Sequence, residues 1–463
     1  MNNQKNNIVD IETESSKERR KLILKLTWPA LAENVLATLV SIADTMMVSV
    51  LGTTAVSAVG LVTQPRFIML SAFMAMGIGS TAIIARCKGS DKREEANRVL
   101  SQSIVLSVLI LAVLCTVMFI FAEPLIRFIA GSEISEASVS AAYDYFIIQV
   151  LGFPFLGLTF TINACLRGAG NTKAAFYSNT AANLVNIFFN YCFIEGRLGF
   201  PRLGVAGASI ATVIGQIVAF VFACCLVLGK KQYIHLKLRS LLKIDGNMIG
   251  RIVKIGIPAA VEQIIMRAGM MIFTIIATSL GEIPYSSHII AMNIQSLSFT
   301  TGMSFGTAAT TLTGQCLGRR RQDLARVYIK TTQKLGYVVS FIIAALLFFG
   351  GGYIASLYSI PDNKELVVAA VAGVLRIIAI VNPISNARFV YNSALRGAGD
   401  SRYTAFTTMA GILITRPLVA GLLVYVFDLG LTGLWVALSS DAIVCYILAK
   451  IRWHKGSWAY INV

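Results

Sequence analysis

The stretch Leu-Arg-Gly-Ala-Gly at residues 166–170 occurs a second time at residues 395–399, a separation of 229 residues. The same separation relates Pro29 to Pro258. Twice 229 is 458, so one duplication accounts for almost all of the 463 residues. A period this long is too large for a solenoid. In a membrane chain it predicts two equal helical bundles with a site between them, which is the plan of transporters that work by rocking.

Hydropathy predicts that the chain is an all-α polytopic membrane protein. The mean hydropathy is +0.70, and only 14% of residues are charged, against ~25% in soluble domains. Twelve apolar stretches are long enough to cross a bilayer. They cover residues 26–51, 56–85, 99–121, 141–165, 175–194, 204–228, 252–280, 286–316, 327–350, 366–392, 404–427 and 430–450. Six fall in each copy, and an even number keeps the two copies parallel in the membrane.

These stretches predict two pseudo-symmetric lobes of six transmembrane helices each. The expected parts are an N-terminal tail (1–25), an N-lobe (26–228), a linker (229–251), a C-lobe (252–450) and a C-terminal tail (451–463). No loop exceeds about 25 residues, so we expect no soluble catalytic domain and no enzymatic activity.

The net charge of +17 could indicate a nucleic-acid partner, but its distribution indicates a membrane instead. Every second connection is basic, and with the N-terminus inside the cell these segments carry 31 lysines and arginines. The opposite loops carry only Arg127, Arg197, Arg202 and Lys364. This asymmetry predicts that both termini are cytoplasmic. We expect a multi-pass plasma-membrane protein, bacterial in origin, that acts as a monomer and binds no nucleic acid.

Acidic residues within the apolar stretches are the first candidates for function. A carboxylate at the centre of a span costs about 2.5–3.5 kcal/mol, so it normally faces a cavity and has a role. Asp44 lies deepest, and Glu33 lies eleven residues earlier on nearly the same helix face. Glu262 is the repeat counterpart of Glu33. The alternatives are a protonated packing acid at Asp44, and acids near the ends of their spans at Glu33 and Glu262 that are structural.

A stripe of asparagines is the second candidate. Asn179, Asn183, Asn186 and Asn190 recur every three or four residues, and Asn163 ends the preceding span. In lipid such a stripe either joins helices, at about 0.6 kcal/mol a contact, or lines an aqueous site. Together with Asp44 and Thr212, the amides provide one charged and several neutral oxygen ligands, which suits a proton relay or a Na⁺ site.

The second copy lacks this stripe and carries cations instead, at Arg267, Arg388 and Arg416. For Arg267, ion pairing with Glu262 or with backbone carbonyls is the simpler interpretation, and substrate binding is the alternative. His288 is the one histidine inside a predicted span, and lone histidines usually pack rather than bind ligands.

Several of these motifs together resemble the multidrug and toxic compound extrusion (MATE) family. The resemblance rests on Pro29 followed by Asp-Thr-Met-Met-Val at 44–48, on the two Leu-Arg-Gly-Ala-Gly turns, on Asn186-x-x-x-Asn190-Tyr191, on Gly-Val-Ala-Gly-Ala-Ser-Ile-Ala-Thr at 204–212, and on Ser287-His288 through Asn293 to Gln315. It spans nearly the whole chain. It implies two lobes around a central V-shaped cavity and export of organic cations or amphiphilic drugs against H⁺ or Na⁺, with no cofactor.

The resemblance also implies roles for particular residues. Some members of the family use an acid in the first helix with an asparagine and an aspartate in the fifth and a threonine in the sixth. Asp44, Asn186, Asn190 and Thr212 match these places, with Asn190 where that branch has aspartate. We therefore expect these four residues to couple or bind the ion, including Na⁺ as a metal ion. Other members carry acids in the seventh and tenth helices, where this chain has Met266-Arg267 and Asn386 to Arg388.

We thus predict an ion-coupled antiporter that works by rocker-switch alternating access. Glu33, Asn163, Asn183, Glu262, Arg267, His288 and Asn293 are the further candidates to line the cavity or bind substrate. The alternative is a lipid-linked oligosaccharide flippase of the related two-lobed class, in which the arginines would face a pyrophosphate. A membrane enzyme would need polar clusters on its loops, and a channel would not explain two specialised lobes.

Overall fold

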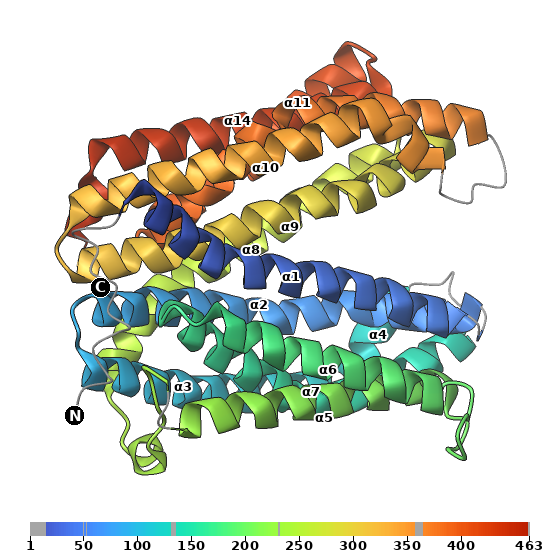
Figure 1. The fold of residues 1–463 in the computed structure, drawn as a ribbon. Coiled ribbons are helices and arrows are strands. Elements are labelled where there is room, and N and C mark those ends of the chain that lie inside the picture. The colour runs from blue at the N-terminus through green and yellow to red at the C-terminus, as the bar shows by residue number, and fades with distance from the viewer. Residues whose placement is uncertain are drawn as a thin grey trace. The chain divides into compact units, whose positions relative to one another are not determined.

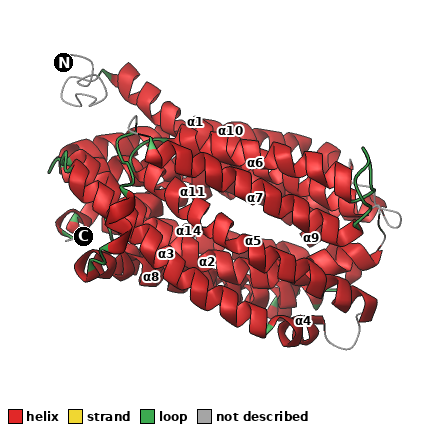
Figure 2. Cartoon of the chain, turned by 90° about the horizontal axis from the view of Figure 1, so that it is seen from below, coloured by secondary structure: helices red, strands yellow, loops and turns green. Residues whose placement is uncertain are grey.

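The computed structural model describes residues 15–49, 51, 53–130, 136–229, 232–356 and 364–461. Within these residues the fold is helical, without strands (Figure 2). The long helices are α1 (Ser16–Ser49), α2 (Thr53–Gly89), α3 (Arg93–Ile120), α5 (Glu136–Gly168), α6 (Thr172–Phe193), α7 (Gly204–Leu228), α8 (Gly246–Thr278), α9 (Glu282–Gly318), α10 (Gln322–Ser356), α11 (Lys364–Gly397) and α14 (Gly430–Lys455). The all-α prediction is confirmed.

The eleventh expected span, residues 404–427, is divided into four shorter helical elements. It runs through α12 (Ser401–Thr408), the π-helical η3 (Met409–Thr415), α13 (Arg416–Gly421) and the π-helical η4 (Leu422–Val426). The remaining elements are the short helix α4 (Ala122–Ala130) and the 3₁₀ turns η2 (Leu238–Leu242) and η5 (Ser457–Tyr460).

Ten of the twelve expected spans are long and apolar enough, within the described part of the chain, to cross a membrane. The other two, α6 and α9, form helices where they are predicted. They fall short in hydropathy because α6 carries the asparagine stripe and α9 is rich in serine, threonine and amide side chains. The chain is therefore a multi-pass membrane protein.

The helices form two compact units, Pro29–Ile264 and Met1–Trp28 with Ile265–Asn462. In the first unit, α5 packs against α2, α3 and α7, and α6 lies beside α7 (Figure 1). In the second unit, α11 packs against α9, α10 and α14 in the same way. The duplication read from the sequence therefore recurs as a duplicated packing scheme.

Two helices cross from one unit to the other. The first turns of α1 belong to the second unit, where Ile23 and Leu26 join a core with residues of α9, α10 and α11. The first half of α8 belongs to the first unit, where Met248 and Ile252 join the core of α2, α3 and α5. The predicted lobe boundaries, 26–228 and 252–450, assign these segments differently and stay a prediction.

The Leu-Arg-Gly-Ala-Gly motifs end α5 and α11 in the same turn. Gly170 and Gly399 take φ values of 81° and 88°, which glycine adopts without strain. The amide of Asn171 donates to the Leu166 carbonyl at 2.9 Å, a reverse turn that closes a helix end. Shortly before each turn, a threonine hydroxyl of a neighbouring helix donates a hydrogen bond to the helix backbone. The Thr81 hydroxyl donates to the Ala164 carbonyl at 2.9 Å, and its repeat counterpart, the Thr310 hydroxyl, donates to the Ser393 carbonyl at 2.9 Å.

Candidate functional site

Asp44 lies in the first unit with its side chain toward α6. Its Oδ1 accepts a hydrogen bond of 2.7 Å from Nδ2 of Asn190. Asn190 is almost fully buried, and its Oδ1 has no hydrogen-bond partner among the described residues. Arg66 on α2 is near enough to interact electrostatically with Asp44. The neighbour in direct contact with the carboxylate is thus a neutral amide, whose own oxygen remains available as a ligand.

The amide of Asn186 lies between Asp44 and Thr212. Its Nδ2 donates to Asp44 Oδ1 at 2.9 Å, and its Oδ1 accepts from Thr212 Oγ1 at 3.2 Å. An ionised carboxylate only accepts hydrogen bonds, whereas a protonated one also donates. Asn186 can therefore hydrogen-bond to both forms of Asp44.

Glu33 contacts the same asparagine stripe nearer the start of α6. Its Oε1 accepts a hydrogen bond of 2.6 Å from Asn179 Nδ2 and lies 3.4 Å from Arg167 Nη1. Arg167 belongs to the Leu-Arg-Gly-Ala-Gly turn that ends α5. The stripe is thus divided between two acids, with Asn179 at Glu33, and Asn186 and Asn190 at Asp44.

Of the remaining candidates of the first unit, two are buried and one is half-buried. Asn183 is half-buried on α6. Asn163 is buried on α5, and its Oδ1 has no hydrogen-bond partner among the described residues. Glu262 on α8 is 1% exposed.

The candidates of the second unit do not form one cluster. Arg267 and Asn293 are exposed. His288 is buried against Phe273 and Trp435, with ring centroids 5.4 Å away in each case. These ring contacts agree with the packing interpretation of His288, which stays a prediction.

The arginines of the second unit are paired with an acid on α14. Asp441 is 1% exposed, and its Oδ1 lies 3.1 Å from Nη1 of Arg388. Its other oxygen accepts a hydrogen bond from Arg416. Two cations and one anion leave a formal charge of +1 in this buried cluster. Local spacing in the sequence could not predict these pairs, because 53 and 25 residues separate Asp441 from Arg388 and Arg416.

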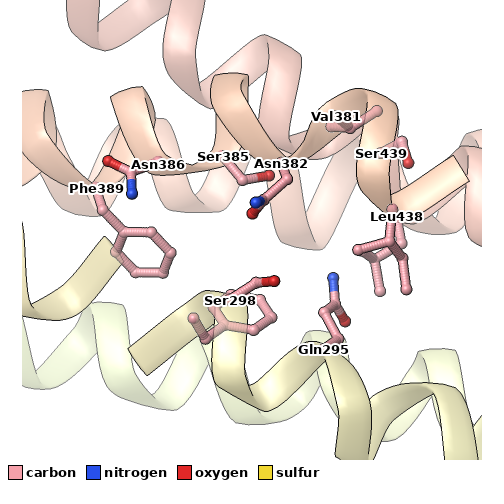
Figure 3. Close-up of a pocket in the computed structure, with 11 residues that line it drawn as sticks. Gln295, Ser298, Val381, Asn382, Ser385, Asn386, Phe389, Leu438 and Ser439 are labelled. Atoms are coloured by element: carbon pink, nitrogen blue, oxygen red, sulfur yellow. The ribbon is translucent and has the colours of Figure 1, made fainter. Parts of the chain in front are cut away.

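A polar cavity of about 20 Å³ lies in the second unit between α9, α11 and α14. Gln295 and Asn382 point into it from facing helices, with Ser298 and Ser385 beside them (Figure 3). This volume is enough for one water molecule. The sequence analysis missed this cavity, because its amides are spread over two helices rather than forming one stripe.

No group of three or more histidine, cysteine, aspartate and glutamate side chains that could hold a metal ion occurs in the described residues. A monovalent cation would have to be held by one carboxylate with neutral oxygens. Asp44 together with the Asn190 carbonyl oxygen and the Thr212 hydroxyl is a donor set of this kind, and oxygen donors suit hard cations.

The chain is similar to known proteins over most of its length. The model of the MatE family matches residues 29–192 and 258–420. A probable multidrug resistance protein NorM of Thermotoga maritima is 29% identical over 95% of this chain and 93% of its own length. An uncharacterized transporter, YisQ of Bacillus subtilis, is 27% identical over 94% of each chain.

Solved structures share the fold. A transporter of the MOP superfamily from Pyrococcus furiosus, described as having a binding pocket of reverse polarity, superposes with a TM-score of 0.88 at 22% identity and covers 95% of this chain and 96% of its own. A multidrug resistance MATE family transporter in an outward-facing conformation superposes with a TM-score of 0.87 at 22% identity, covering 94% and 96%.

Proposed function

Because this chain belongs to the MatE family, a family of membrane transporters, we propose that it exports small organic cations and amphiphilic drugs in exchange for H⁺ or Na⁺. Relatives named as multidrug resistance proteins support the substrate class. The observation that carries the coupling mechanism is the contact between Asp44 and Asn190, which presents one carboxylate to a neutral amide inside a membrane helix bundle.

The exchange follows from competition for one negative charge. A coupling ion from outside, H⁺ or Na⁺, and a cationic substrate from inside cannot both neutralise Asp44. Loading of one therefore releases the other, and rocking of the two lobes carries each across in its own direction. The central cavity that this requires, the cytoplasmic location of both termini and a monomeric state are parts of the same proposal.

Both coupling ions have support from the site. The Asn186 amide lies against Asp44 and has both a donor and an acceptor, so it can hydrogen-bond to the ionised and to the protonated carboxyl group, as a proton cycle requires. The unsatisfied Oδ1 of Asn190 suits Na⁺, which needs neutral oxygen ligands beside the carboxylate. A transport measurement with separate gradients decides between them.

The driving force is sufficient. An inward proton gains about 2.3 kcal/mol per 100 mV and about 1.36 kcal/mol per pH unit. With ~100 mV and ~1 pH unit the total is about 3.7 kcal/mol, enough for a substrate gradient of several hundredfold per proton.

The flippase alternative is the weaker proposal. It requires arginines that face a pyrophosphate, but Arg388 and Arg416 are both paired with Asp441. Pairing with a buried acid lowers the charge available to an anionic substrate. The chain also has twelve expected spans, whereas that class usually has more.

Ethidium efflux from proteoliposomes tests the proposal, with a pH gradient and a Na⁺ gradient imposed separately. We expect export to follow one of the gradients and to be abolished in Asp44→Asn. The matched control is Asp144→Asn, which changes an exposed aspartate on α5. Export by Asp44→Asn at the rate of the control would overturn the mechanism, and export that follows neither gradient would overturn ion coupling.

A further inference from the structure

We propose that the start of α10 carries a binding site for the phosphate headgroup of an anionic phospholipid. Two cavities of about 450 Å³ and 380 Å³ lie on either side of Lys330, both within the second unit. Arg19, Arg20 and Lys334 line the first cavity. The second is lined by Arg326 of α10 and by Lys450 and His454 of α14. We place this lipid in the cytoplasmic leaflet. That placement depends on the cytoplasmic location of both termini proposed above.

The spacing of the cations on α10 indicates an anionic ligand. Arg326, Lys330 and Lys334 follow one another at intervals of four residues, so they share one face of the helix. Like charges at this spacing destabilise a helix by about 0.2–0.5 kcal/mol per pair. Acidic residues are absent from the linings of both cavities. A phosphate group among these side chains would remove the repulsion.

The first copy of the repeat uses the equivalent face differently. Asn97, Ser101 and Gln102 lie 229 residues before Arg326, Lys330 and Thr331. Asn97 and Gln102 hold the linker through its backbone, at His235 N (2.9 Å) and Lys243 O (2.7 Å), and Ser101 bonds to Ser240 at 2.6 Å. Neutral side chains thus bind a peptide segment in one copy, and two of the three are replaced by cations in the other.

The surroundings indicate a lipid rather than a soluble phosphate. Along α10, Val338, Phe341 and Ile342 are exposed apolar residues that follow the cations. On α1, Leu24 and Trp28 are exposed after Arg20. The second cavity is lined by aromatic side chains as well, at Tyr337, Tyr391, Tyr446 and Trp453. Basic pockets at the cytoplasmic side and aromatic residues at the membrane interface are typical of lipid headgroup sites.

Native mass spectrometry of the full chain in detergent tests this site, with phosphatidylglycerol, phosphatidylcholine and inorganic phosphate added separately. We expect phosphatidylglycerol to bind and the other two not to. The double variant Lys330→Gln/Lys334→Gln should bind it about 30-fold more weakly, at ~1 kcal/mol per basic side chain. The control, Lys17→Gln/Lys21→Gln, removes the same charge from exposed positions of α1 outside both linings and should bind as the unmodified chain does.

Each contrary result has its own meaning. Equal weakening in both double variants would overturn the site in favour of a general charge effect. Binding of inorganic phosphate at the same concentration would overturn the lipid as its source. Lipid binding is measured without transport, so it stands or falls apart from the drug-export proposal.

Discussion

Asn190 of α6 donates a hydrogen bond of 2.7 Å to the carboxylate of Asp44 on α1, across 146 residues of sequence. This contact joins the deepest acid of the first helix to the last asparagine of the stripe. It also leaves the Asn190 carbonyl oxygen buried without a partner among the described residues. One amide therefore supplies both a donor to the carboxylate and an unused acceptor.

Asn190→Leu removes both groups while keeping a side chain of similar size. Hydrogen bonds to charged groups contribute about 1.5–3 kcal/mol, so we expect ion-driven ethidium export to fall by about tenfold or more. Asn247→Leu, at an exposed position near the start of α8, should export normally. Equal export by the two variants in proteoliposomes would show that Asn190 has no part in coupling.

Glu33 and Asn179 should be energetically coupled, because their side chains are joined by a hydrogen bond of 2.6 Å. A double-mutant cycle with Glu33→Gln and Asn179→Leu measures the coupling from unfolding in detergent. We expect an interaction energy of about 0.5–3 kcal/mol, as for other contacting pairs. Additive effects would mean that the two residues act independently, and Glu33→Gln with normal stability but impaired export would favour a transport role for Glu33.

The sequence predicted most of the helices, because these depend on local hydropathy and on the repeat. That the two copies have different functions stays a prediction. The sequence also predicted the face of α6 that meets Asp44, since asparagines at intervals of three and four residues can point only one way. The partners of Glu33 were only partly predicted from the sequence. Asn179 was in the stripe, but Arg167 was interpreted as a turn residue, and its approach to Glu33 depends on how α5 packs.

Tertiary packing produced the features that local patterns could not predict. The pairing of Arg388 and Arg416 with Asp441 joins three separate elements. The crossing of α1 and α8 between the compact units depends on which core each end of a helix joins. The π-helical segments η3 and η4 leave no simple periodicity in the residues that form them.

Gly168 should be intolerant of alanine. A Cβ atom there would lie 2.7 Å from the carbonyl oxygen of Thr81 on α2, a backbone atom that cannot move away easily. We expect Gly168→Ala to destabilise the protein by about 1–3 kcal/mol, as overpacking does. Gly60→Ala is the matched control, since nothing lies within 4 Å of its Cβ position; it should be neutral or stabilise by up to about 1 kcal/mol. Thermal unfolding in detergent compares them, and equal transition temperatures would contradict the close approach of α2 and α5.

The stability of the protein should depend on Asp441 as the anion that pairs with the two buried arginines. It should not depend on the cluster being charged. Asp441→Asn leaves Arg388 and Arg416 buried without their anion, and breaking a buried pair in this way costs about 3–5 kcal/mol. Replacing all three residues with Met, Met and Leu removes the charges together and should recover most of that loss, because buried ion pairs are often no more stable than apolar packing.

Asp428→Asn is the control for the same chemical change, since Asp428 is exposed and its φ of 51° is one that asparagine tolerates. By free energy of unfolding in detergent, the control and the unmodified chain should be the most stable. The triple variant should be less stable, and Asp441→Asn the least stable. If Asp441→Asn were as stable as the control, the two arginines would have to be neutralised by another group. A triple variant that is stable but inactive in ethidium export would instead give the cluster a role in transport.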